Sequence, residues 1–139
     1  MTRLIILIAI FFTAIPAKAI RSIKGFPSQK IITINIDEKG RIFIGKDTLT
    51  TDQLSDELQK RLWGSYMGTD RMYDAIHLEF SSVVSESILA GVKKAIHEGQ
   101  KKALTDLCLQ KHKKLFEDLN SHQQRKIRKQ FPVLFQQGF

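Results

Sequence analysis

Residues 31–44 restrict the fold more than any other stretch, because apolar and polar side chains alternate there on both sides of a short turn. Isoleucines alternate with Thr and Asn over residues 32–36, the period of a half-buried β-strand. The Asp-Glu-Lys-Gly sequence at 37–40 supplies a turn that ends in glycine, and residues 41–44 resume an apolar, β-branched run. We therefore predict a β-hairpin, with a second turn at 45–47.

A helix is predicted to follow this hairpin. Thr50 and Gln53 have the spacing of a capping box, in which each side chain binds the backbone amide of the other residue. Leu54, Leu58 and Leu62 then recur every four residues and form one apolar stripe. We expect this helix to end near Leu62 and a loop to cover residues 63–73.

Two further elements complete the predicted domain. Apolar and polar side chains alternate again over residues 75–80, which indicates a third strand. From about Ser82 the apolar period becomes helical and continues to Leu107, with Gly99 either ending this helix or tolerated inside it. The predicted fold class is α+β: a β-hairpin, a helix, a strand and a long helix, with a small sheet packed on one side by helices and a basic helical C-terminal tail.

The first 19 residues have the organisation of a secretory signal peptide. Arg3 gives a positive start, residues 4–15 form an uncharged apolar run, and Ala17-Lys18-Ala19 is a small-residue cleavage site. This apolar run is shorter than the roughly 20 residues that span a bilayer. We expect export with cleavage after Ala19; the alternative is an uncleaved short membrane anchor. Both place the protein in the periplasm or at the outer face of the inner membrane.

The positive charge of the chain is concentrated near its C-terminus. The whole chain has 22 Lys and Arg against 14 Asp and Glu. Residues 20–107, the predicted domain, are nearly balanced, whereas residues 108–139 hold 7 basic and 2 acidic residues. A basic balance favours a nucleic acid or an anionic membrane as partner. Export argues against nucleic acid, so we expect no nucleic-acid partner.

Residues 108–139 are predicted to form a basic amphipathic helical tail that ends at Pro132. Two interpretations are open: a solvated helix that covers part of the core, or a surface that binds anionic lipid or an acidic partner. The candidate interaction residues are the seven cations of this segment: Lys111, Lys113, Lys114, Arg125, Lys126, Arg128 and Lys129.

The sequence offers little for catalysis or metal binding. It contains no phosphate-binding loop, dinucleotide fingerprint, nucleophile elbow or zinc-protease motif. Cys108 and His112 have helical ligand spacing but lack two further ligands, and Ser81, Ser82 and Ser85 are better explained as helix caps than as nucleophiles. We predict no enzyme activity, cofactor or metal. Cys108 is either a buried thiol or, in an oxidising compartment, half of an intermolecular disulfide.

With the hairpin ITINIDEKGRIFIGK at 32–46 and the helix at 49–62 in place, the chain resembles the extracytoplasmic domain of the ExbD/TolR family of biopolymer-transport proteins. Residues 76–80 and 88–96 are similar to the third strand and second helix of that family. The resemblance spans residues 30–104. It implies a homodimer in the cell envelope that works by protein–protein interaction, with a proton-channel partner of an inner-membrane transport complex.

The chain also departs from that family. Residues 4–15 contain no acid, so the membrane aspartate of proton coupling has no counterpart here. Phe80-Ser81-Ser82 replaces the family's Ala-Asp, and the basic tail stands where a final strand would follow. The resemblance therefore implies a non-enzymatic interaction domain without the proton-coupling step. The alternative is an exported peripheral protein that binds a membrane surface through residues 108–139.

Overall fold

The computed structural model describes residues 28–139. The predicted signal peptide or anchor over residues 1–19 and the first residues after it lie outside this described part. The described residues form four strands: β1 (Ile31–Ile36), β2 (Ile42–Ile44), β3 (Asp47–Leu49) and β4 (Ala75–Phe80). The helices are α1 (Thr51–Thr69), α2 (Glu86–His112) and α3 (Ser121–Gln130), with short 3-10 helices η2 (Phe116–Asp118) and η3 (Pro132–Phe135).

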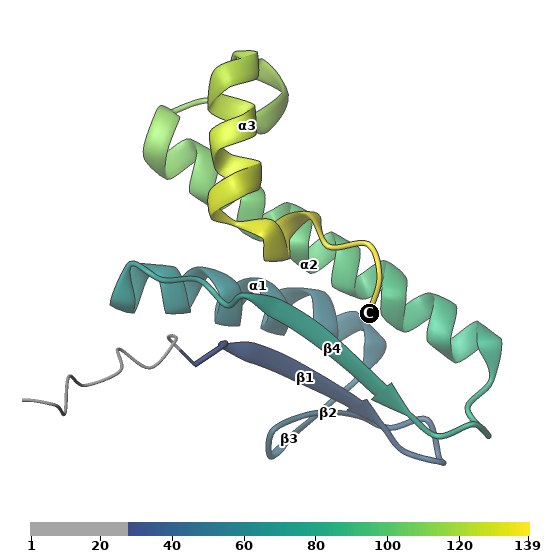
Figure 1. Cartoon of the computed structure of the whole chain (residues 1–139). Coiled ribbons are helices and arrows are strands. Elements are labelled where there is room, and N and C mark those ends of the chain that lie inside the picture. Colours follow the sequence, from purple (N-terminus) through teal and green to yellow (C-terminus); the bar gives the residue numbers. More distant parts are fainter. Residues whose placement is uncertain (1–27) are drawn as a thin grey trace, which may run out of the picture.

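The strands form one mixed sheet in the order β3-β2-β1-β4. β1 and β2 are the antiparallel hairpin, in which Ile34 faces Ile44, and β4 pairs with β1 in parallel. α1 lies in the crossover that this parallel pairing requires. Figure 1 shows α1 and α2 on one side of the sheet, with α3 rising beyond the far end of α2. The predicted α+β class, with its one-sided helical layer, is confirmed.

Side chains alternate between the two faces of each strand, and those on the face toward α1 and α2 form the core. Ile32, Ile34 and Ile36 of β1 are buried, and β4 contributes Ile76 and Leu78 to the same face. They meet the predicted leucine stripe of α1, which is fully buried at positions 54, 58 and 62. The opposite face of the sheet carries exposed polar side chains, among them those of β4 at 77 and 79.

α1 begins where the sequence predicts and ends later. Thr50 and Gln53 form the capping box. The helix then continues to Thr69 instead of ending near Leu62, so the expectation of a loop from residue 63 is wrong. Gly64 and Gly68 face open space and are tolerated within the helix, and Asp70 ends it in the left-handed conformation at φ 54°.

α2 runs without interruption through Gly99 and past the predicted domain limit at 107. It has 27 residues, with Ser85 as its N-cap and Lys113 as its left-handed C-cap. A Cβ atom at position 99 would lie 2.8 Å from the Ser55 carbonyl oxygen and 3.0 Å from Leu58 Cβ. Gly99 therefore lies where α2 packs tightly against α1 and leaves no room for a side chain, which offsets its low helix propensity.

The C-terminal residues differ from the single helix that their composition predicts. The chain turns after His112, passes through η2, and returns as α3, whose N-cap Asn120 forms a second capping box with Gln123. Ile127, Val133 and Leu134 are buried in the same core cluster as the sheet residues. In residues 28–139, no helix is long and apolar enough to cross a membrane.

Candidate functional site

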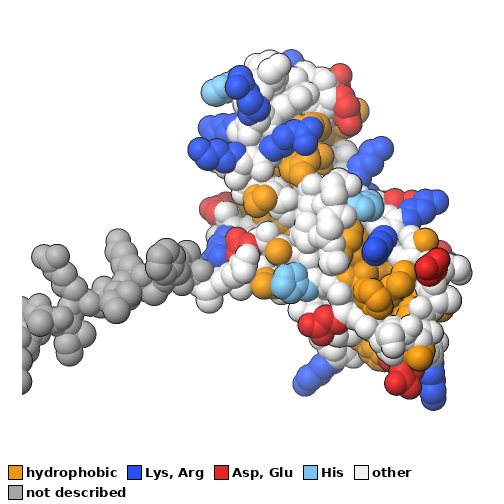
Figure 2. All heavy atoms as spheres, turned by 45° about the vertical axis from the view of Figure 1, so that its right-hand side comes forward, with side chains coloured by type: hydrophobic (Ala, Val, Ile, Leu, Met, Phe, Trp, Pro, Cys, Tyr) orange, Lys and Arg blue, Asp and Glu red, His pale blue; other side chains and the backbone are white. Residues whose placement is uncertain are grey.

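The seven predicted cations lie at the end of α2, directly after it, and on α3. Lys111 is in the last turn of α2, and Lys113 and Lys114 follow it directly, whereas the other four belong to α3. Figure 2 shows Lys and Arg side chains gathered over the upper lobe that the end of α2 and α3 build. The structure thus brings the seven residues into one lobe, but it does not place them along one helix.

Two of the seven lie over aromatic rings. The Lys111 ammonium lies 5.5 Å from the ring centroids of both Tyr66 and Phe131. The Arg128 guanidinium lies 5.1 Å from the Phe116 ring and 4.6 Å from the Phe135 ring. These are cation–π distances, so Lys111 and Arg128 help to hold the lobe together and cover its aromatic residues.

The other five cations are Lys113, Lys114, Arg125, Lys126 and Lys129. All are exposed, and none takes part in the ion pairs found among residues 28–139. Positions 122, 125, 126 and 129 follow the i, i+3, i+4, i+7 spacing of one helix face. These four residues, His122, Arg125, Lys126 and Lys129, line one shallow groove, and Lys126 also lines a second groove with Lys111 and His112.

The edge of β4 is a second candidate site, and none of its residues is among the predicted interaction residues. The Ile76 amide donates to Gln136 Oε1 at 2.9 Å, and Gln136 Nε2 donates to the Ile76 carbonyl at 2.7 Å. Alternate residues of a strand direct their backbone groups to the same side, so Leu78 and Phe80 also point theirs away from β1. Within residues 28–139, no strand pairs with this edge.

Gln100 holds the C-terminal segment at that edge. Its side chain is 2% exposed, and its amide nitrogen donates to the carbonyls of Val133 at 2.7 Å and Gln136 at 3.1 Å. The Phe139 ring packs beside His97 on the same helix. Gln100 and Gln136 had no sequence signal, because a glutamine on a basic helix or near a C-terminus has no local pattern that distinguishes it.

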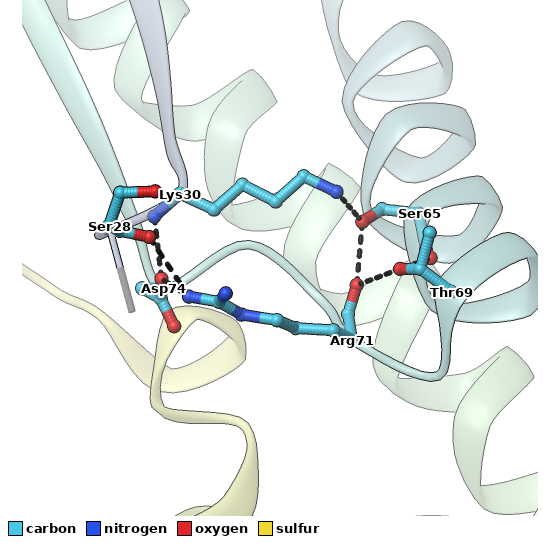
Figure 3. Close-up of polar contacts among 6 residues, drawn as sticks. All are labelled: Ser28, Lys30, Ser65, Thr69, Arg71 and Asp74. Carbon is cyan, nitrogen blue, oxygen red and sulfur yellow. Dashed lines mark hydrogen bonds and ion pairs between the residues drawn. The ribbon is translucent and has the colours of Figure 1, made fainter. Parts of the chain in front are cut away.

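A polar network joins the starts of β1 and β4 to the end of α1 (Figure 3). Asp74 Oδ2 accepts from the Lys30 amide at 2.6 Å and from the Arg71 guanidinium at 2.8 Å. Lys30 Nζ donates to Ser65 Oγ at 2.6 Å, and Ser65 Oγ donates to the Arg71 carbonyl at 2.7 Å. The Ser65 hydroxyl therefore donates its proton to a carbonyl, and the Lys30 ammonium donates to that hydroxyl. This hydrogen bonding indicates a structural role for the network, which connects the strands to α1.

This network changes the acidity of Asp74. The hydrogen bond from the Lys30 amide is the main reason that the pKa of Asp74 lies below its ordinary value, and the Arg71 guanidinium adds to the effect against the opposing effect of burial. The ionised form of Asp74 therefore contributes to the stability of the fold.

Cys108 is a buried free thiol on α2. Burial raises the pKa of this thiol, and the nearby charge of Glu117 adds to the rise. Such a thiol is a poor nucleophile and metal ligand. In the described part of the chain, no group of three or more His, Cys, Asp or Glu side chains is arranged to hold a metal ion.

Ser85 caps α2 by accepting a hydrogen bond from the Ile88 amide, as predicted.

Comparison with known proteins does not assign the chain to a family. No protein-family model matches it, and no curated protein sequence matches it.

Proposed function

We propose that the chain is a non-enzymatic interaction module of the cell envelope that self-associates through the edge of β4. The proposal retains the resemblance to the extracytoplasmic domain of the ExbD/TolR family, whose order of hairpin, helix, strand and helix agrees with that of this fold. It excludes the proton-coupling step, because residues 4–15 contain no acid.

The observation that carries this proposal is the state of the β4 edge. Gln136 satisfies the outward backbone groups at Ile76, and those of Leu78 and Phe80 face away from β1 without a strand beside them in the described residues. Exposed backbone groups in a row can pair with a strand from another chain. The resemblance to the ExbD/TolR family implies a final strand after the second helix, and this chain has its basic tail at that place in the sequence.

Apolar side chains lie beside the same edge. Phe80 is 46% exposed at the end of β4, and Val83, in the turn to α2, is 67% exposed. Their burial in a dimer would add to the main-chain hydrogen bonds, since the removal of apolar surface from water is favourable. A second copy of the chain offers the same two features and can satisfy both partners symmetrically.

Sedimentation velocity over a concentration series tests the proposal. The unchanged chain is expected to form dimers, and Phe80→Lys is expected to raise the dissociation constant at least about tenfold, because lysine on an edge strand opposes pairing. Val83→Lys is the second variant, since this side chain has little burial to lose within one subunit.

Thr48→Lys is the matched control. It adds the same charge to an exposed position on β3, at the opposite edge of the same sheet, and should leave the dimer unchanged. A chain that stays monomeric at all concentrations would overturn the proposal, as would equal weakening by Phe80→Lys and Thr48→Lys. Circular dichroism of each variant establishes that the subunit remains folded.

A further inference from the structure

We infer that the outer face of α3 is a docking surface for an anionic lipid membrane. This surface, the α3 basic face, consists of Arg125, Lys126 and Lys129 together with His122. It is a separate site from the β4 edge, and neither proposal depends on the other.

The α3 basic face is held rigidly and is not a loose tail. Ile127, on the opposite side of α3, is 2% exposed, and Phe131 at its end packs edge-to-face on Tyr66 of α1 at 5.4 Å between ring centroids. The Asn120 capping box fixes the start of the helix. The cations are therefore presented on a scaffold whose geometry is already formed before any partner binds.

No acidic side chain within residues 28–139 pairs with the cations of this face. Its three cations form no ion pair within residues 28–139, and Arg125 bonds only to the Ser121 carbonyl of its own helix, at 3.4 Å. No acidic side chain lines the groove on α3 or the adjoining one at Lys126. Like charges at three- and four-residue spacing destabilise a helix slightly, and an anionic partner would remove that cost.

Membrane lipid fits this surface better than nucleic acid does. Proteins that bind single-stranded nucleic acid use exposed aromatic rings on which bases stack. Here the aromatic rings of the lobe are covered: Arg128 lies over Phe116 and Phe135, and Lys111 lies over Tyr66 and Phe131. Leu115, by contrast, is 45% exposed directly after Lys113 and Lys114, an apolar side chain beside cations such as interfacial proteins insert among headgroups. The predicted signal peptide or short anchor over residues 1–19 is also expected to bring the chain to a membrane.

Vesicle co-sedimentation of the full chain, in the form that cells produce, tests this inference. Phosphatidylcholine vesicles with and without phosphatidylglycerol are compared at an ionic strength of about 0.15 M. The measured quantity is the increase in binding caused by the anionic lipid, so any insertion of an apolar N-terminus into both vesicle types cancels. Each Lys or Arg near an anionic surface contributes roughly a fivefold factor to binding.

The main variant is Arg125→Gln, Lys126→Gln and Lys129→Gln combined, and we expect it to lower the lipid-dependent binding by roughly 100-fold. The matched control is Lys39→Gln, Lys46→Gln and Lys60→Gln, which removes the same charge from exposed positions in two hairpin turns and on α1. This control should bind almost as well as the unchanged chain. The charge-conserving combination of Arg125→Lys, Lys126→Arg and Lys129→Arg should also bind.

Three results would overturn the inference. The first is that the unchanged chain shows no added binding to the anionic vesicles. The second is an equal loss of binding in the two glutamine triples, which would indicate net charge without a site. The third is that a double-stranded oligonucleotide binds at the same salt concentration while the vesicles do not. Phe80→Lys, the variant for the β4 edge, should leave vesicle binding unchanged, so the two proposals fail or succeed separately.

Discussion

Asp74 is the residue at which three parts of the chain meet. It accepts hydrogen bonds from the backbone of Lys30, directly before β1, and from Arg71 in the segment after α1, and it stands directly before β4. Its lowered pKa means that the folded state favours the carboxylate more than the unfolded state does. The contribution is therefore complete above the ordinary value of 3.8 and is lost as the pH falls through the lowered pKa.

We predict that Asp74→Asn destabilises the fold at neutral pH and has a smaller effect in acid. The loss should stay below about 1 kcal/mol, because the side chain is 36% exposed and solvent screens the charge. Urea unfolding at neutral pH and at pH about 2.5 measures both differences. Asp118→Asn, at an exposed carboxylate with no side-chain partner in residues 28–139, is the control. A difference in unfolding free energy between Asp74→Asn and the unchanged chain that is the same at both pH values would contradict this prediction.

At the scale of elements, the packing of α2 on α1 includes one contact that only glycine can make, at Gly99. Gly99 of α2 lies tightly against the Ser55 backbone and Leu58 of α1. Ser55 is itself buried, and its hydroxyl has no hydrogen-bond partner in the described structure. The contact between the helices thus combines close backbone approach and the leucine stripe with two polar contacts at its margin, Gln59 to Asp106 and Lys102 to Asp56, each 2.6 Å long.

We predict opposite effects for alanine at the two glycines of α2. Gly99→Ala should destabilise the protein by about 1–3 kcal/mol, because the new methyl group overlaps backbone that cannot move cheaply. Gly91→Ala should stabilise it by up to about 1 kcal/mol through helix propensity, since its methyl group would meet Thr51 Cγ2 at an ordinary 3.7 Å. Chemical denaturation of both variants measures the two changes in the free energy of unfolding. Stabilisation by Gly99→Ala would contradict the tight packing of α2 against α1 at this position.

At the scale of the whole molecule, both proposals require that the chain reaches the outer side of a membrane. The β4 edge and the α3 basic face lie on different parts of the structure, at the end of the sheet and in the upper lobe of Figure 1. One copy could therefore pair with another while the lobe contacts lipid. Such an arrangement would make the chain a membrane-surface module of the envelope.

We predict that the protein isolated from its native cells begins at Ile20. The reason is the small-residue site Ala17-Lys18-Ala19 after an apolar run too short to span a bilayer. Intact mass, measured on the soluble and membrane fractions separately, identifies the first residue. A mass that includes Met1 in the membrane fraction would instead support the uncleaved anchor, and a channel partner would be the next target to seek.

Local patterns were sufficient for most of the elements. The hairpin at β1–β2, the capping box at Thr50 and the strand β4 all depend on residues within a few positions of one another. The seven cations were also found from composition, and their function stays a prediction. The end of α1 was misjudged because Gly64 and Gly68 resemble helix stops, whereas the burial of neighbouring side chains against the core favours continuation.

Sequence alone therefore determined the hairpin, the amphipathic helices and the basic C-terminal composition, since spacing along the chain sets which side chains share a face. The tertiary structure decided the parallel pairing of β1 with β4, the tolerance of Gly99 and the fold-back of α3. It also decided the contact of Gln136 with Ile76, two residues 60 positions apart. These features depend on which surfaces bury one another across the core, a competition among distant contacts that no local period records.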